Sequence, residues 1–110
     1  MNLKYLEEVS AGDPHFKKEL IEIFLRQVPE FVLNMKKFYA EKDWPNLAKE
    51  AHTAKSSALI FGMEETGSAL KNIQLFAEES KTDEIPVLID KSIVELENAC
   101  LSLVELAQDL

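Results

Sequence analysis

A histidine, a lysine and a serine lie close enough along the chain to be neighbours on one helix. They are His52, Lys55 and Ser56 in the segment KEAHTAKSSALIFG, and side chains three and four residues apart meet on a helix surface. A neutral imidazole has a nucleophilic ring nitrogen. If that nitrogen accepted a phosphoryl group, the Lys55 ammonium could attract the new negative charge and the Ser56 hydroxyl could donate a hydrogen bond to its oxygens. The spacing is compatible with a phosphate carrier, although it is also common on ordinary solvated helix faces.

These three residues are predicted to lie on the exposed side of their helix. The buried stripe of that helix consists of apolar residues at spacings of four and three: Leu47, Ala51, Ala54, Ala58 and Phe61. At about 100° per residue, His52 projects roughly 140° from the middle of the stripe and therefore toward solvent. Ala48 and Leu59 fall on the flank between the stripe and the polar residues. We expect them to provide apolar contacts on a docking surface around His52, to which a short N-terminal helix could add.

Glycine, proline and capping residues indicate where the helices begin and end. No run of residues alternates polar and apolar side chains as a strand would. The expected elements are a short helix over residues 3–9, a second helix capped by Asp13, a third capped by Asp43 and stopped by Gly62, a fourth over residues 64–80 and a connection over residues 81–86. Pro29 lies inside the second helix and should kink or divide it.

The two longest helices carry apolar stripes along their length. In the second helix the stripe is Phe16, Leu20, Phe24, Val28, Phe31, Met35 and Phe38. In the final helix it is Ile89, Ile93, Leu96, Cys100, Leu103, Ala107 and Leu110. No helix could bury such a stripe alone. The chain is therefore predicted to be all-α, an antiparallel up-and-down four-helix bundle with a short extra N-terminal helix, forming one domain over residues 1–110.

Composition and charge limit the kinds of partner. With 46% hydrophobic and 29% charged residues, the chain should fold. Its net charge of -8 opposes binding to nucleic acid phosphates or to an anionic membrane surface, so we expect protein partners. No stretch is apolar enough to span a bilayer and the N-terminus does not resemble a secretory signal, which makes the cytoplasm the default location. Cys100 is the only cysteine and is expected to be a small core residue.

The segment from His52 to Gly62 resembles the signature of histidine-containing phosphotransfer (HPt) domains, the phosphate-carrying modules of multistep His-Asp phosphorelays. That signature places a lysine three residues after the histidine, a small residue at four and a glycine at ten, as Lys55, Ser56 and Gly62 do here. The stretches SAGDPHFKKELIEIFLRQVPEF, AEKDWPNLAKEAH and TGSALKNIQLFAEES also look like this family. The resemblance covers roughly the whole chain, and it implies a four-helix bundle whose exposed histidine carries the phosphoryl group.

The resemblance also implies roles for individual residues and for the partner. His52 would take a phosphoryl group from an aspartyl phosphate on one receiver domain and pass it to another, with Lys55 as the adjacent cation. In the family a polar side chain from the following helix often hydrogen-bonds the imidazole, and Gln74 is similarly placed, although it could also be a plain surface amide. The receiver would supply the aspartate, Mg²⁺ and its own lysine. The chain itself is expected to be a monomeric phosphocarrier and not an enzyme, with no bound cofactor or metal.

The chain departs from the family pattern at two positions. Ser56 stands where glycine is most common, and it adds a side chain beside the ring where a receiver must approach. Ala54 replaces the usual leucine on the buried side of the helix. The first change leaves the geometry of the acceptor open, while the second is expected to alter packing rather than chemistry.

Helical bundles also serve other functions. A di-iron site would need Glu-x-x-His motifs, but Lys49 and Gly12 stand three residues before the two histidines, so this class is excluded. A histidine kinase is excluded because the chain has no Gly-rich ATP-binding domain and is too short to hold one. A helical adaptor, or an HPt-like interaction module without phosphotransfer, stays open.

Overall fold

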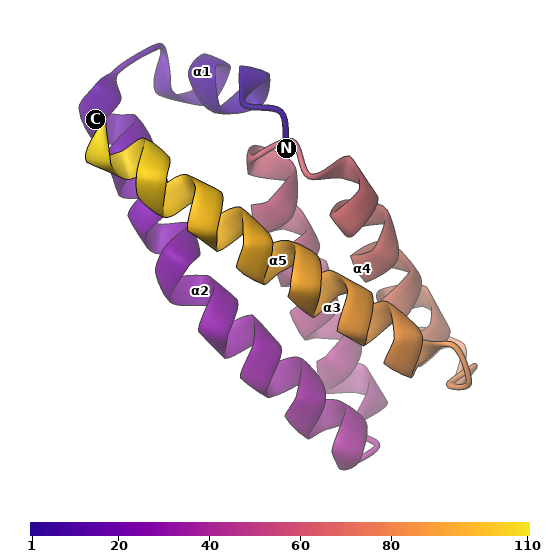
Figure 1. Cartoon of the computed structure of the whole chain (residues 1–110). Coiled ribbons are helices and arrows are strands. Elements are labelled where there is room, and N and C mark those ends of the chain that lie inside the picture. The colour runs from indigo at the N-terminus through magenta and orange to yellow at the C-terminus, as the bar shows by residue number, and fades with distance from the viewer.

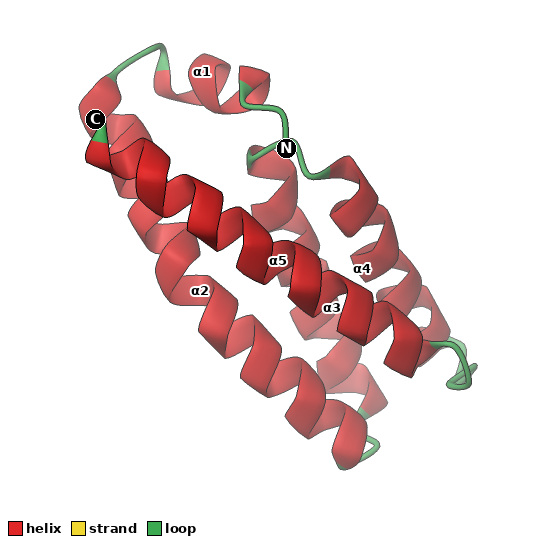
Figure 2. Ribbon diagram, viewed as in Figure 1, coloured by secondary structure: helices red, strands yellow, loops and turns green.

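Five α-helices and no strands make up the computed structural model, which describes all 110 residues (Figures 1 and 2). The helices are α1 (Lys4–Ser10), α2 (Pro14–Ala40), α3 (Trp44–Ile60), α4 (Glu64–Glu78) and α5 (Ile85–Gln108). The last four run alternately up and down, and each packs against its two neighbours in a ring that α5 closes against α2. α1 lies across the end of the bundle where α2 begins and α3 ends (Figure 1). The predicted fold, with its short N-terminal helix, is confirmed.

Aspartates cap the two helices for which the sequence predicted caps. Asp13 accepts a hydrogen bond from the backbone N–H of His15 at 3.0 Å, and Asp43 accepts one from the backbone N–H of Asn46 at 3.3 Å. Both helices have a proline in the first turn, where the absent N–H would have had no helical partner. The starts of α2 and α3 are therefore fixed by local chemistry, and the register of α3 determines where its side chains point.

Two predicted boundaries and one predicted break differ from the structure. α4 ends at Glu78 and not at Ser80, because Ser80 takes a left-handed conformation with φ of 57°. α5 begins at Ile85, so Pro86 lies in its first turn and not in the connection. α2 passes through Pro29 without being divided. Pro29 lies on the exposed side of α2, where the carbonyl that it leaves without a donor can be hydrated.

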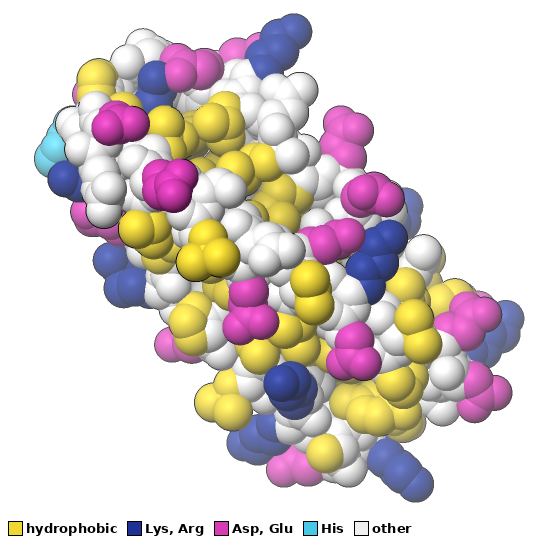
Figure 3. All heavy atoms as spheres, viewed as in Figure 1, with side chains coloured by type: hydrophobic (Ala, Val, Ile, Leu, Met, Phe, Trp, Pro, Cys, Tyr) yellow, Lys and Arg dark blue, Asp and Glu magenta, His cyan; other side chains and the backbone are white.

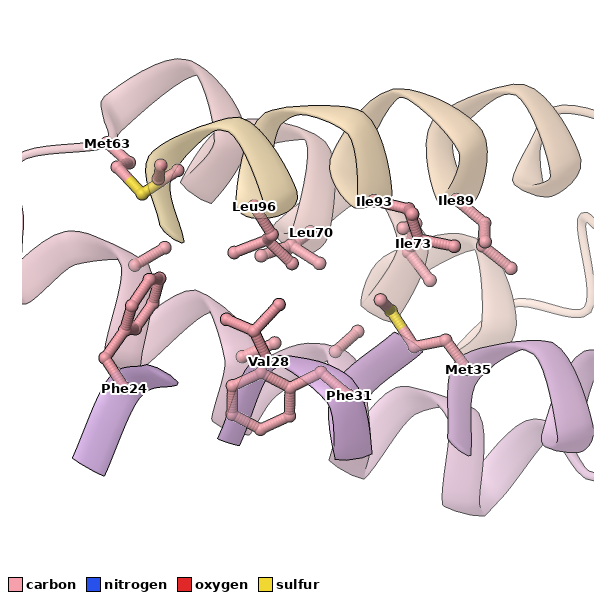
Figure 4. Close-up of a cluster of buried hydrophobic side chains, with 14 of the residues drawn as sticks. Phe24, Val28, Phe31, Met35, Met63, Leu70, Ile73, Ile89, Ile93 and Leu96 are labelled. Atoms are coloured by element: carbon pink, nitrogen blue, oxygen red, sulfur yellow. The ribbon is translucent and has the colours of Figure 1, made fainter. Parts of the chain in front are cut away.

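One core of 22 buried hydrophobic residues runs through the bundle. In Figure 4, side chains of α2 point toward side chains of α4 and α5: Phe24, Val28, Phe31 and Met35 face Leu70, Ile73, Ile89, Ile93 and Leu96. The apolar stripes predicted for α2 and α5 are confirmed along most of their length and wrong at one end of each. Phe16 and Leu110 are exposed because they lie at helix ends, beyond the facing helices. Ile21 and Ala99 are buried although neither was predicted to be in a stripe.

Cys100 lies at the edge of the core, where it is half-buried and not fully enclosed as predicted. Burial raises the pKa of its thiol, and the Glu97 carboxylate adds to the shift because it disfavours a second negative charge nearby. The thiol is therefore protonated at neutral pH, which makes it a poor nucleophile.

Apolar side chains also remain on the surface that α5 forms, diagonally across the bundle from α3. Figure 3 shows hydrophobic side chains over much of this face. Val87, Val94 and Leu101 are the most exposed large hydrophobic residues of α5. No helix combines the length and the apolar character that a membrane-spanning segment would need.

Candidate functional site

The two faces of α3 differ in burial as the sequence predicted. All five residues of the predicted stripe are buried: Leu47, Ala51, Ala54, Ala58 and Phe61. His52 is exposed on the other side of the helix. Since three of the buried residues are alanines, the backbone of α3 lies close to the core, and there is little free space in which the helix could roll. The packing of this buried stripe therefore determines that the His52 side chain points away from the core.

Gln74 of α4 contacts the ring of His52. The distance between Nδ1 of His52 and Oε1 of Gln74 is 3.3 Å. An amide oxygen can only accept a hydrogen bond, so Nδ1 carries the proton in this arrangement. The other ring nitrogen, Nε2, then keeps its lone pair. The facing helix thus orients the ring and favours the tautomer in which Nε2 holds the free lone pair.

Lys55 lies nearer to α4 than predicted. The sequence placed it on the exposed side with His52, but it is half-buried. A methyl group added at Gly67 would lie 3.9 Å from Cγ of Lys55 and 2.8 Å from Cδ2 of Leu59. The absence of a side chain at Gly67 therefore leaves room for the side chain of Leu59 against α4, and the stem of Lys55 passes close to the same place. The ammonium of Lys55 forms no ion pair, so its charge remains available to a ligand.

Ser56 is exposed next to His52, but its hydroxyl is already engaged. Oγ of Ser56 donates a hydrogen bond to the backbone carbonyl of His52 at 3.2 Å. This bond directs the hydroxyl along the helix. The hydroxyl would have to rotate before it could donate to a group on the ring.

One of the two predicted docking residues is buried. Ala48 is only 6% exposed, because its methyl group is too short to extend past α4. It forms part of the floor of a hollow of about 840 Å³ between α3 and α4, which His52, Gln74 and Trp44 also line. Leu59 is 42% exposed, as expected of a contact residue.

A second hollow lies on the other side of His52, between α1 and α3. Its volume is about 610 Å³, and Tyr5, Ser56 and Leu59 are among its lining residues. The sequence did not single out Tyr5, although it predicted that the short N-terminal helix could supply apolar contacts; the crossing of α1 over the end of the bundle brings Tyr5 near Leu59. Tyr5 of α1 and the side chains of Ser56 and Leu59 of α3 thus form one surface next to the turn of α3 that carries His52.

Gly62 ends α3 as the sequence predicted, and it also allows the N-terminal segment to pack closely against it. Its φ of 66° lies in the left-handed region. A methyl group there would lie 2.0 Å from the backbone oxygen of Asn2. The backbone N–H of Asn2 donates to the carbonyl of Phe61 at 3.2 Å. Glycine therefore lets the start of the chain lie against the end of α3.

The site contains no arrangement of three or more histidine, cysteine, aspartate or glutamate side chains that could hold a metal ion, and neither does the rest of the structure. The groups around His52 are an amide, a hydroxyl and an unpaired ammonium. This set can orient a nucleophile and balance the charge of an anion bound to it.

A bundle with an exposed, oriented histidine on one helix is the architecture of an Hpt domain. Residues 19–109 match the Hpt domain family, so the chain belongs to that family, as the resemblance predicted. Hpt domains are histidine phosphotransfer modules of phosphorelays: they carry phosphoryl groups and interact with receiver domains.

A crystal structure of histidine-containing phosphotransfer protein B (HptB) from Pseudomonas aeruginosa PAO1 has the same fold, with a TM-score of 0.90. The two chains are 16% identical, and the match covers 97% of this chain and 93% of that one. At such low identity the likeness concerns the fold alone. No curated protein matches the chain at a significant level.

Proposed function

We propose that the protein accepts a phosphoryl group on Nε2 of His52 from an aspartyl phosphate of one receiver domain and passes it to an aspartate of another. The observation that supports this most directly is the contact between Nδ1 of His52 and Gln74 on an exposed part of α3, because a neutral ring that donates from Nδ1 keeps its lone pair on Nε2. In the forward step the Nε2 lone pair attacks phosphorus, the phosphorus–nitrogen bond forms, the phosphorus–oxygen bond breaks and the aspartate leaves as a carboxylate. Nδ1 keeps its proton throughout, and the second transfer is the reverse of the first.

The role of this chain is that of a phosphocarrier with little catalytic machinery of its own. It supplies the nucleophile and its orientation through Gln74, and a cation in Lys55 that attracts the phosphoryl oxygens. We assign Mg²⁺, the acidic pocket and the catalytic lysine to the receiver domain. Phosphoryl transfer depends mainly on alignment and on charge stabilisation, so one oriented imidazole is sufficient when the partner brings the metal.

We assign receiver docking to the surface around His52 that the two hollows flank. On one side lies the hollow between α3 and α4, and on the other the hollow between α1 and α3 with Tyr5 and Leu59. Both aromatic and aliphatic groups are exposed there, as is common in protein interfaces. His52, Lys55 and Gln74 all belong to one chain, so a monomer contains the complete site. We assign the protein to the cytoplasm.

Phosphoryl transfer from a radiolabelled, phosphorylated receiver domain tests this proposal. The protein should acquire a label that survives alkali and is lost in acid, as expected of a phosphorus–nitrogen bond. His52→Gln should abolish the label and leave the circular dichroism spectrum unchanged, because the side chain is exposed.

His15→Gln is the matched control, since His15 is the other histidine and is exposed on α2. That protein should be labelled like the wild type. Persistent labelling of the His52→Gln protein would sink the assignment. Failure of every receiver to label the wild type, with receiver binding retained, would instead point to an interaction module without phosphotransfer.

A further inference from the structure

Lys71 lies on the side of α4 that faces the histidine. Gly67, Lys71 and Gln74 follow one another at spacings of four and three and therefore share one face of α4. Both ends of that face contact α3, because Gln74 contacts His52 and Gly67 lies under the side chain of Leu59. Lys71 stands between these two contacts, about 4.5 Å along the helix axis from Gln74. Lys71 itself is exposed, so its side chain is open to solvent.

The ammonium of Lys71 is available to an anion. It makes no ion pair with any carboxylate, and the same holds for Lys55 and for Lys49, which lies one turn before His52 on α3. Three unpaired cations therefore lie within two helical turns of His52 or of its partner Gln74. The chain as a whole is acidic, with 20 acidic and 12 basic residues. Two carboxylates without an ion pair, Glu50 and Glu78, lie in the same range, and Glu78 lines the hollow beside His52. The unpaired cations around the histidine thus exceed the unpaired carboxylates by one, although the protein as a whole is acidic.

We propose that Lys71 binds the phosphoryl group carried by His52, so that this group lies between a cation of α3, Lys55, and a cation of α4. The inference rests on the proposed function of His52. A phosphoryl group brings close to two negative charges. The net charge of -8 disfavours such a group on this protein unless nearby cations offset it. Cations on two different helices restrain the group from two directions, which one lysine cannot do.

Phosphoramidate serves as the phosphoryl donor in the test, so that no receiver is needed. The bond between phosphorus and nitrogen in the donor breaks, ammonia leaves and a bond between phosphorus and Nε2 of His52 forms. A His15→Gln background leaves one reactive histidine. The proton affinity of the attached phosphoryl group is then measured at low salt by ³¹P NMR titration. A neighbouring ammonium lowers this proton affinity, so the Lys71→Ala protein should have an affinity about two- to fivefold higher than the protein with Lys71. Lys71→Arg keeps the positive charge and should return the affinity to the value found with Lys71.

Lys36→Ala is the matched control, since Lys36 is also exposed and unpaired but lies on α2. It removes the same charge and should leave the proton affinity unchanged. High salt should reduce the effect of Lys71→Ala. Equal affinities in the Lys71→Ala and Lys36→Ala proteins would overturn this inference alone, because His52 would still be labelled. A wild type that neither phosphoramidate nor a phosphorylated receiver can label would overturn the proposed function and this inference with it.

Discussion

Nδ1 of His52 lies 3.3 Å from Oε1 of Gln74, although the two residues are 22 positions apart. The contact joins α3 to the helix that packs against it. A ring on an exposed helix face would otherwise rotate freely about two side-chain torsions. Gln74 restricts that rotation and favours the tautomer with the proton on Nδ1, so the ring is partly oriented without any partner.

Replacing Gln74 should slow phosphoryl transfer without unfolding the bundle. Gln74→Ala removes one hydrogen bond to the ring, which corresponds to about a two- to tenfold slower transfer. The rate from a phosphorylated receiver measures the effect, and ¹⁵N NMR of the imidazole should show a loss of the Nδ1–H tautomer. Asn72→Ala, on the exposed side of α4 away from α3, is the control and should match the wild type in both measurements. An unchanged tautomer in the Gln74→Ala protein would contradict the orienting role.

Ser56 should affect transfer through its size and not through its hydroxyl. Because Oγ of Ser56 donates to the carbonyl of His52, Ser56→Ala should change the transfer rate by less than about twofold. Ser56→Gln places a longer side chain beside the ring and should slow transfer at least about tenfold by obstructing the receiver. Transfer rates at saturating receiver measure both effects. A large loss of rate in the Ser56→Ala protein would show that the hydroxyl does serve the phosphoryl group.

Leu59 should contribute to receiver binding. It is 42% exposed beside the hollow between α1 and α3, and Leu59→Ala should weaken binding of a receiver about two- to tenfold, as measured by titration calorimetry. Leu33→Ala is the control: Leu33 is 66% exposed on α2 and should have no effect on binding. If both variants lose affinity equally, the docking surface must lie elsewhere.

Gly62 should be intolerant of substitution for two separable reasons. Gly62→Ala requires a left-handed alanine and brings a methyl group within 2.0 Å of the backbone oxygen of Asn2. Gly12→Ala has only the first cost: its φ is 74°, but the nearest atom to an added methyl group is 4.0 Å away. Urea unfolding should show a loss of about 1 kcal/mol for Gly12→Ala and about 2–4 kcal/mol for Gly62→Ala. Equal losses would mean that the start of the chain moves aside at no cost.

The sequence predicted the histidine face of α3 correctly because five buried residues determine the rotation of the helix. The caps at Asp13 and Asp43 were predictable for a similar reason, since each depends on residues within one turn. Helix caps and the apolar stripe of one helix each depend on residues within a short segment, so they can be predicted from that segment alone.

Predictions on the flank of α3 were less accurate. Ala48 is buried and Lys55 is half-buried because both face α4, and a helical angle does not tell how close the next helix lies. The contact between Asn2 and Gly62 had no signal in the sequence at all, since it depends on how α1 crosses the end of the bundle. Such contacts follow from tertiary packing between segments that are distant along the chain.

The buried alanines of α3 (Ala51, Ala54 and Ala58) and its exposed residues near His52 differ in how well they should tolerate substitution. A single methylene added at Ala54 would disturb the packing of the whole bundle, whereas Leu59 and Ser56 lie outside the core. On the docking surface proposed above, substitutions at Leu59 and Ser56 should change the choice of receiver with little change in stability, because both side chains are exposed. Receiver specificity in such a domain should therefore be able to change through surface substitutions alone, while the buried core of the bundle stays the same.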